Sequence, residues 1–85
     1  MESNHPYVEL ILYDLGKLYL AQSKYVEAET CFQRTLAIQE ERLKPEHPEV
    51  APTLEHYADL LRKTGRETEA ATLEARAQVI RAKQE

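Results

Sequence analysis

The stretch from Tyr25 to Leu43 shows the clearest spacing of apolar and polar positions in the chain. Apolar and small residues recur there at steps of three and four, which is the spacing of one helical face; they are Ala28, Cys31, Phe32, Thr35 and Ile38. Leu36 and Leu43 lie on a second flank, and acidic and amide side chains fill most positions between the two. A helix with two apolar flanks needs packing partners on both sides. The stretch therefore predicts a central helix between two others.

The chain repeats itself at an offset of 42 residues. His5-Pro6-Tyr7-Val8 returns as His47-Pro48-Glu49-Val50. When residues 5–43 are laid over residues 47–85, ten of the 39 pairs are identical. An internal period of this size is typical of helical repeat arrays, in which each repeat is one supersecondary unit. Each copy is interpreted as two antiparallel helices.

Prolines and glycines mark where the four predicted helices begin and end. Pro6 suits a first helical turn, where its missing N–H does no harm, and Pro45 disfavours helix in the residue before it. Gly65 is the expected left-handed cap of the third helix. Because Pro52 lies one turn inside that helix, either the regular helix begins nearer Val50 or its first turn is distorted. The expected helices span 6–22, 25–43, 48–64 and 67–82.

Small residues recur where the two helices of each pair should cross. Gly16 is expected beside Ala28, and Ala58 beside Ala70, with large apolar residues flanking both crossings. Small residues beside large ones let two helix backbones approach closely. Glycine inside a helix costs about 1 kcal/mol against alanine, so Gly16 predicts a crossing at which close approach matters.

These motifs resemble the tetratricopeptide repeat. The first copy reads Leu12-x2-Leu15-Gly16-x2-Tyr19 and then Ala28-x3-Phe32-x2-Thr35, and the second reads Leu54-x2-Tyr57-Ala58-x2-Leu61 and then Ala70-x3-Glu74-x2-Ala77. The 42-residue period, HPEVA at 47–51 and KYVEAE at 24–29 are similar to the long-repeat branch, which includes kinesin light chains and bacterial regulatory repeat proteins. The resemblance implies an all-α fold of two helix–turn–helix repeats, about 5–44 and 47–85, in a single domain 1–85. Its four antiparallel helices would form a short right-handed α-solenoid.

Three positions depart from the family pattern. Ser23 stands where the turn glycine is usual, and Thr35 replaces a usual alanine. Glu74 replaces a large apolar residue, which predicts a solvated outer face on the fourth helix, as at the end of a repeat array. The first helix differs, because apolar residues cover most of its circumference; they are Leu10, Ile11, Leu12, Tyr13, Leu15, Leu18, Tyr19 and Leu20. A helix that is apolar all round is normally buried all round, so we expect this helix to pack on upstream repeats or on a second copy of the chain.

Composition and charge narrow the function classes. The 85 residues suffice for one domain, and the net charge of −4 argues against nucleic acid, whose phosphates call for a basic face. No apolar run reaches the roughly 20 residues of a membrane span, and the first residues lack the features of a signal peptide. The single cysteine, Cys31, allows no intramolecular disulfide. The expected setting is the reducing cytoplasm.

No pattern in the sequence predicts catalysis, a cofactor or a metal. His56 lies near Glu55 and Asp59, but a structural zinc site needs four ligands, usually including cysteine or several histidines. We interpret this cluster as a solvated polar face. His5 and His47 precede prolines and are expected in turns or caps, and Cys31 is expected as a small buried hydrophobe. The chain is predicted to be no enzyme.

In the family that the sequence resembles, the first helix of each pair lines a concave groove that takes peptides. By position this implies nine partner-binding residues: Leu10, Tyr13, Asp14, Lys17, Leu20, Glu55, His56, Asp59 and Arg62. Tyr13 and Lys17 stand where the carboxylate-clamp subclass has its first lysine and asparagine, so that activity is not predicted. The leading function is a non-catalytic module that binds a peptide or partner helix. One alternative is self-assembly through the apolar N-terminal helix, and another is a regulatory segment of a larger enzyme.

Overall fold

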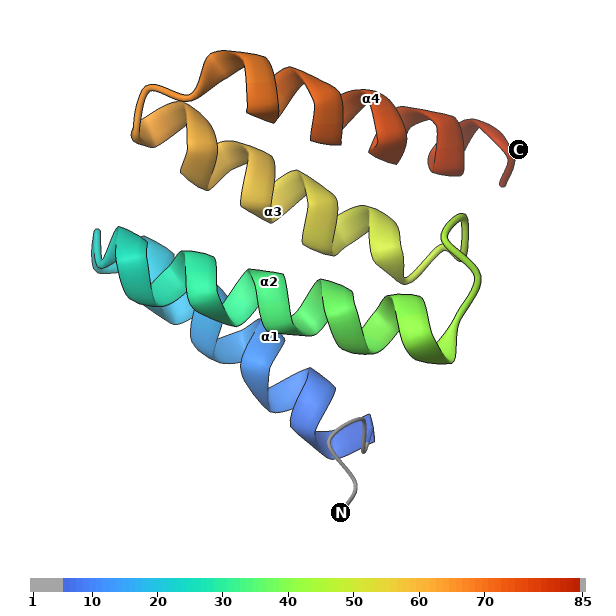
Figure 1. Cartoon of the computed structure of the whole chain (residues 1–85), viewed down its shortest axis with the longest axis horizontal. Helices are drawn as coiled ribbons and strands as arrows, with labels where there is room; N and C mark the ends of the chain where they lie inside the picture. Colours follow the sequence, from blue (N-terminus) through green and yellow to red (C-terminus); the bar gives the residue numbers. More distant parts are fainter. Residues whose placement is uncertain (1–5, 85) are drawn as a thin grey trace.

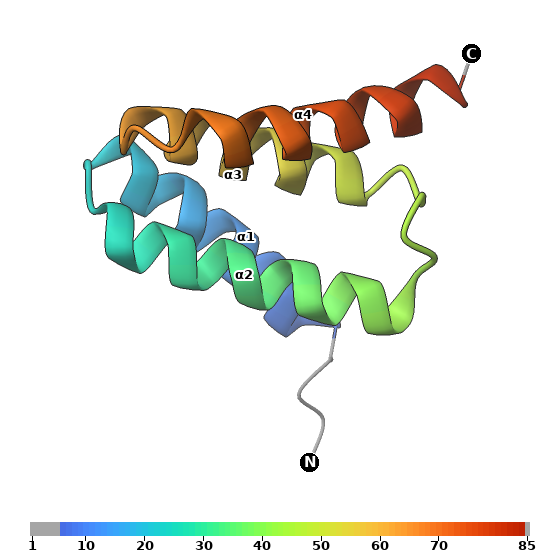
Figure 2. The same ribbon diagram turned by 45° about the horizontal axis from the view of Figure 1, so that its top comes forward.

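The computed structural model describes residues 6–84 as four helices in sequence (Figure 1). They are α1 (Pro6–Ala21), α2 (Tyr25–Arg42), α3 (Val50–Lys63) and α4 (Glu67–Ala82). Successive helices run in opposite directions, and each packs against the next along the chain. Figure 2 shows the α1–α2 and α3–α4 hairpins as two layers, joined by residues 43–49. The predicted all-α fold of two helical hairpins is confirmed.

The helix ends follow the local sequence signals. α3 begins at Val50, so Pro52 is its third residue and lies where backbone N–H groups have no partner inside the helix. The first of the two alternatives for Pro52 is therefore correct. In the loop before α3, the backbone N–H of Glu49 donates to His47 Nδ1 over 3.1 Å, which confirms the turn role of this histidine. His5, for which the same role was expected, lies outside the described residues.

The core consists of three clusters that run along the layers. One joins all four helices around Phe32, Tyr57 and Leu60; a second joins Val50 and Leu54 to α4; the third joins α1 to α2. The cysteine belongs to the third cluster, and burial raises the pKa of its thiol, as expected for an inert buried residue. The Thr35 hydroxyl, at the position of a usual alanine, donates to the Cys31 carbonyl over 2.8 Å.

Close approach at Gly16 is confirmed, but its main neighbour is Phe32. A Cβ added to Gly16 would lie 2.6 Å from Phe32 Cε1 and 2.9 Å from Cδ1. Phe32 is fully buried, and its ring also lies near the rings of Tyr13 and Tyr57. The ring of Phe32 from α2 therefore occupies the space that a side chain at position 16 would need. Ala28 is not among the three nearest contacts of the added Cβ.

Both hairpin turns contain a residue in the left-handed region of backbone conformation. Gly65 has φ +79°, which confirms its predicted cap role, whereas the equivalent position in the first hairpin holds Ser23 with φ 62°. A residue with a Cβ pays roughly 1–2 kcal/mol in this conformation, and glycine does not. The first turn is thus strained where the second is relaxed.

This difference predicts opposite effects of exchanging the two residues. Ser23→Gly should raise stability by about 0.5 kcal/mol, because relief of the strain exceeds the extra chain entropy of glycine in the unfolded state. Gly65→Ser should lower stability by about 1 kcal/mol through conformation alone, since no heavy atom lies within 4 Å of its added Cβ. Thermal unfolding followed by circular dichroism checks both signs. Shifts of equal sign would show that backbone strain does not decide stability at these turns.

Candidate functional site

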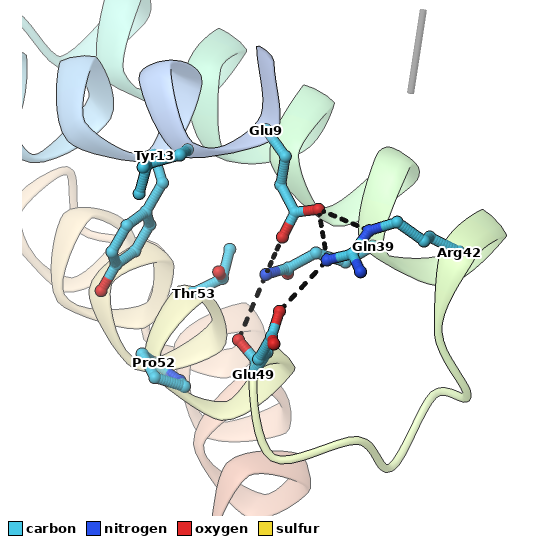
Figure 3. Close-up of a pocket in the computed structure, with 8 residues that line it drawn as sticks. Glu9, Tyr13, Gln39, Arg42, Glu49, Pro52 and Thr53 are labelled. Carbon is cyan, nitrogen blue, oxygen red and sulfur yellow. Dashed lines mark hydrogen bonds and ion pairs between the residues drawn. The ribbon is translucent and has the colours of Figure 1, made fainter. Parts of the chain in front are cut away.

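Two hollows lie along the valley between α1 and α3. The N-terminal hollow, of about 450 Å³, adjoins the first turns of both helices; its lining is Glu9, Leu10, Tyr13, Gln39, Arg42, Glu49, Pro52 and Thr53 (Figure 3). The C-terminal hollow, of about 380 Å³, adjoins their last turns; its lining is Lys17, Leu20, Ala21, Ser23, Tyr25, His56, Asp59 and Lys63. Both hollows take residues from α1 and from α3, and we call the strip between these two helices, with its two hollows, the valley.

Tyr13 and His56 join the two helices between the hollows. The Tyr13 hydroxyl lies 3.0 Å from His56 Nδ1, and this nitrogen also lies 2.9 Å from the Pro52 carbonyl oxygen. The two rings meet edge to face with their centroids 5.5 Å apart. Lys17 Nζ lies 4.7 Å from the Tyr13 ring centroid, within the range of a cation–π contact. The contact between Tyr13 and His56 therefore links α1 to α3 between the two hollows.

The polar wall of the N-terminal hollow centres on the buried carboxylate of Glu9. Arg42 donates to Glu9 Oε1 through Nε (3.0 Å) and Nη2 (2.7 Å), and Gln39 Nε2 donates to Glu9 Oε2 over 3.1 Å. Arg42 Nη2 also donates to Glu49 Oε1 over 3.1 Å, and Gln39 Nε2 to the Glu49 carbonyl over 3.2 Å. The wall thus connects α1, the end of α2 and the residue before α3 (Figure 3).

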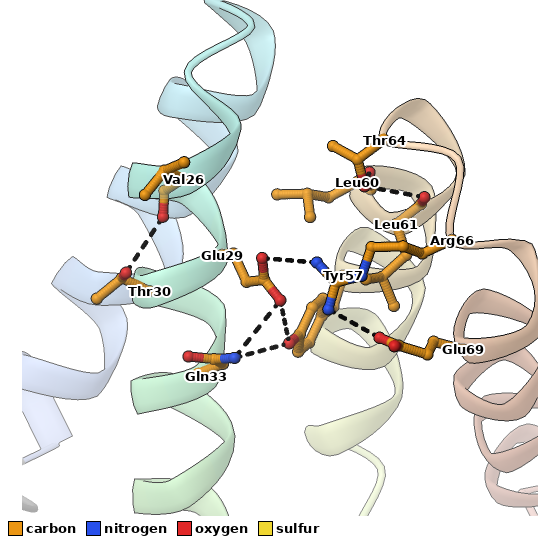
Figure 4. Close-up of polar contacts among 10 residues, drawn as sticks. All are labelled: Val26, Glu29, Thr30, Gln33, Tyr57, Leu60, Leu61, Thr64, Arg66 and Glu69. Atoms are coloured by element: carbon orange, nitrogen blue, oxygen red, sulfur yellow. Dashed lines mark hydrogen bonds and ion pairs between the residues drawn. The ribbon is translucent and has the colours of Figure 1, made fainter.

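A second polar network joins α2 to the second repeat (Figure 4). Arg66 Nη1 donates to Glu29 Oε1 over 2.9 Å, and the Tyr57 hydroxyl donates to Glu29 Oε2 over 2.9 Å. Gln33 Nε2 donates to the Tyr57 hydroxyl over 3.1 Å, and Arg66 also pairs with Glu69. The hydrogen bond from Arg66 lowers the pKa of Glu29, and burial raises the pKa of Tyr57. The network fixes the second repeat against the first.

The lowered pKa of Glu29 makes part of the stability dependent on pH. A carboxyl group whose pKa is lower in the folded state stabilises the fold above its unfolded pKa, and that contribution is lost as the pH falls through the folded value. Glu29→Gln should therefore destabilise the protein at neutral pH, and the difference from the wild type should shrink below the ordinary glutamate value of 4.5. Urea unfolding at about pH 7 and about pH 3 measures this difference.

Glu41→Gln is the matched control for that experiment, because Glu41 is an exposed residue of the same helix. We expect this control to follow the wild type at both pH values. If the effect of Glu29→Gln were equally large in acid, the carboxylate charge would not carry the contribution of this network.

The structure brings six of the nine predicted partner-binding residues to the hollows. Leu10 and Tyr13 line the N-terminal hollow, and the C-terminal hollow is lined by the other four: Lys17, Leu20, His56 and Asp59. Leu20 is also largely buried in the core, so it offers little free surface. The remaining three line neither hollow. Asp14 is exposed, and its Oδ1 lies 3.8 Å from Lys17 Nζ. Glu55 pairs with Arg81. Arg62 pairs with Glu74 and Glu67.

Sequence reasoning missed the polar wall of the N-terminal hollow. Glu9, Gln39, Arg42 and Glu49 were not among the predicted residues, although Glu9 interrupts the apolar face of the first helix. Its counterpart 42 residues on is Ala51, which is fully buried. A carboxylate at the repeat position of a buried alanine is the signal that could have found this wall.

The family model described as tetratricopeptide repeat matches residues 7–82, which covers most of the chain. The chain belongs to the tetratricopeptide repeat family. Tetratricopeptide repeats are protein–protein interaction modules that typically serve as non-catalytic scaffolds, and the two helical hairpins are two such repeats. None of the curated proteins compared with the chain matches it.

Two further findings concern the part of this tetratricopeptide repeat protein that the structure describes. Within residues 6–84, every helix is too short or too polar to cross a membrane. Over the same residues, histidine, cysteine and carboxylate side chains do not gather in threes at any place that could hold a metal ion.

Proposed function

We propose that this pair of tetratricopeptide repeats binds a peptide or a helix of a partner protein in the valley between α1 and α3. The observation that supports the proposal most directly is that two hollows, each lined by both helices, lie in line along this valley. Leu10 and Leu20, which line opposite hollows, are about 15 Å apart along α1 at 1.5 Å per residue. An extended segment of about four or five residues spans that length.

The side chains along the valley suit an amphipathic segment. Tyr13 offers an aromatic anchor at the centre, and tyrosine is among the residues that tend to dominate binding energy. Half-exposed Leu10 gives an apolar surface at one end, and Lys17, Asp59 and Lys63 give mixed charge at the other. We expect the bound segment to place apolar residues over Leu10 and Tyr13 and polar residues toward the last turns of the helices.

Two leucines on α1 allow a matched test. Peptides would be selected from a random display library against the immobilised protein, and their affinities measured by fluorescence polarisation. Leu10→Ala should weaken binding about fivefold, as expected for roughly 1 kcal/mol of lost apolar contact. Leu18→Ala is the control, because Leu18 is exposed to a similar extent on the same helix but lines neither hollow. Binding weakened by Leu18→Ala and not by Leu10→Ala would place the partner outside the valley and refute the proposal.

A second candidate function is self-association with another copy of the chain through the outer side of α1. Ile11 and Leu18 are 57% and 51% exposed, whereas their counterparts 42 residues on, Thr53 and Leu60, are 1% and 0% exposed. Leu60 lies in a cluster with Ala28 and Phe32 of α2. α1 thus exposes the apolar positions that α3 buries when it packs onto the first repeat, and a second copy would cover them.

Light scattering over a range of concentrations tests the second candidate. The wild type should increase in mass with concentration, and the double substitution of Ile11 and Leu18 by glutamate should remain monomeric with unchanged helicity. Val79→Glu is the control, because Val79 is half-exposed on α4, far along the chain from α1. A wild type that stays monomeric at millimolar concentration would exclude self-association through this surface.

A further inference from the structure

The N-terminal hollow has a chemistry that selects one kind of side chain. We propose that it takes an arginine or lysine side chain of the segment bound in the valley. The proposal rests on the proposed function and names the chemistry that the partner supplies at one end of the valley. Four features of the hollow support it. The hydrogen-bond donors of its wall are largely engaged, one acceptor is left over, the lining has a net negative charge, and the rest of the lining is apolar.

The hydrogen-bond donors of the wall are largely engaged within the protein. The Gln39 amide nitrogen has two hydrogens, and two acceptors lie within reach of it: Glu9 Oε2 at 3.1 Å and the Glu49 carbonyl oxygen at 3.2 Å. The Arg42 guanidinium donates twice to Glu9 and once to Glu49. A ligand that brings only acceptors, such as a carboxylate, would therefore compete with these bonds at Gln39 Nε2 and at Arg42 Nε and Nη2.

An acceptor is left over in the same wall. Gln39 is 4% exposed, and its Oε1 is buried with no hydrogen-bond partner. Turning the amide over would not help, because the oxygen would then face the two acceptors that the nitrogen now contacts. An unsatisfied buried acceptor lowers stability. A hydrogen-bond donor that reaches Gln39 Oε1 therefore contributes more to the free energy of binding than an ordinary hydrogen bond does. Figure 3 shows this amide between Glu9 and Glu49, in the middle of the lining residues.

The charge of the lining favours a cation. Its charged residues are the carboxylates of Glu9 and Glu49 and the guanidinium of Arg42, which leaves a formal charge of −1.

The rest of the lining is apolar and suits a long aliphatic stem. Tyr13 and Pro52 face the polar wall across the hollow, and Leu10 also belongs to the lining. Arginine and lysine combine a flexible hydrocarbon stem with a tip that only donates hydrogen bonds. Leu10, Arg42 and Glu49 are the exposed lining residues, and Glu49 is the one among them whose charge attracts the cationic tip. Gln39 Oε1 is closed to solvent, so the tip reaches it only after neighbouring side chains of the lining move aside.

Small probes test the chemistry directly by NMR titration of the whole chain. N-acetyl-arginine amide and N-acetyl-lysine amide are the basic probes, and N-acetyl-citrulline amide is the neutral control with nearly the shape of arginine. At least one basic probe should give saturable shifts at the Gln39 side-chain amide and at the Leu10 and Tyr13 backbone amides. Its affinity should exceed that of citrulline at least fivefold. Equal affinities, or shifts away from the hollow only, would overturn the proposal.

A pair of substitutions in one loop shows which carboxylate binds the basic probe. Glu49→Gln removes a carboxylate of the hollow, and Glu46→Gln removes one three residues earlier that pairs with Lys83 and lies outside the hollow. Both change the net charge equally. The affinity for the better basic probe should fall about fivefold with Glu49→Gln and stay unchanged with Glu46→Gln. An equal loss in both variants would mean that only the overall charge attracts the probe, and the proposal would fail.

The outcome separates this inference from the proposed function. Selected peptides whose binding depends on Leu10 but not on any arginine or lysine would refute the basic-side-chain proposal and leave valley binding intact. Basic probes that bind the hollow in a protein that selects no peptide would have the opposite meaning. In that case the hollow would recognise the basic side chain, and the proposed function would fail.

Discussion

Replacing Gly16 by leucine should unfold the first hairpin, and even alanine at this position should destabilise the protein. A Cβ there would lie 2.6 Å from the ring of Phe32, which is fully buried and cannot turn away without displacing its neighbours. Overpacking a close-packed core costs about 1–3 kcal/mol and sometimes more. We expect about 1–2 kcal/mol for alanine and at least 3 kcal/mol for leucine. The latter is a large share of the roughly 5–10 kcal/mol that holds a domain of this size together.

The sign of the alanine effect makes the prediction sharp. Helix propensity alone would have Gly16→Ala raise the stability by about 1 kcal/mol. Urea unfolding followed by helical circular dichroism gives the free energy of unfolding for the variant and the wild type. Adding Phe32→Leu to Gly16→Ala should recover part of the loss, because the smaller side chain makes room for the methyl group. A stabilising Gly16→Ala, or a double variant with purely additive losses, would show that the ring does not fill this site tightly.

Removing the carboxylate of Glu9 should be the second most damaging change. Glu9 is 7% exposed and accepts hydrogen bonds from both Arg42 and Gln39. Glu9→Ala removes this acceptor, so Arg42 and Gln39 keep only their bonds to Glu49, and buried charge pairs that lose one member cost about 3–5 kcal/mol. Because the Arg42 side chain is about one-third exposed and water can reach it, we expect a smaller loss of about 2–3 kcal/mol.

Two further variants check the Glu9 prediction by urea unfolding. Glu9→Gln keeps one oxygen acceptor and should lose less than Glu9→Ala. Glu40→Ala removes a carboxylate that pairs with Arg76 at the surface and should change the stability by less than about 0.5 kcal/mol. A Glu9→Ala variant no less stable than Glu40→Ala would mean that water replaces the lost carboxylate without penalty.

The sequence is sufficient for the helices, because their signals are local. The spacing of Ala28, Cys31 and Phe32 predicts the buried face of α2, and Gly65 marks the turn that it occupies with a positive φ. Pro52 left two possibilities, which differ by where the first hydrogen bonds of α3 form. That choice depends on the loop before the helix, where backbone groups of residues 44–48 bond to those of 47–51. Most of the information that predicts the helices comes from the 42-residue internal period.

The side-chain pairs across helices could not be predicted in the same way. Glu74 was expected on a solvated face, and the structure shows it partly exposed in an ion pair with Arg62 of α3. Arg62 was carried over as a groove residue, yet its side chain turns toward α4 and also reaches Glu67. Which residues pair across two helices depends on how each helix is rotated about its own axis. A repeat pattern gives the face on which a residue lies, but it does not give the residue opposite.

The two outer edges of the repeat pair have opposite chemistry. α1 exposes Ile11 and Leu18, whereas α4 carries Glu74 and Gln78 where α2 has Phe32 and Leu36 at the same repeat positions. Stacking one copy head to tail on the next would press the Glu74–Arg62 pair against leucine and isoleucine, at the cost of removing charges from water. Two α1 edges that face each other bring Ile11 and Leu18 of both copies together, with the exposed Asp14 beside them, and a contact of this kind is related by a two-fold axis. Copies that meet through this edge therefore close at two and do not grow into a fibre.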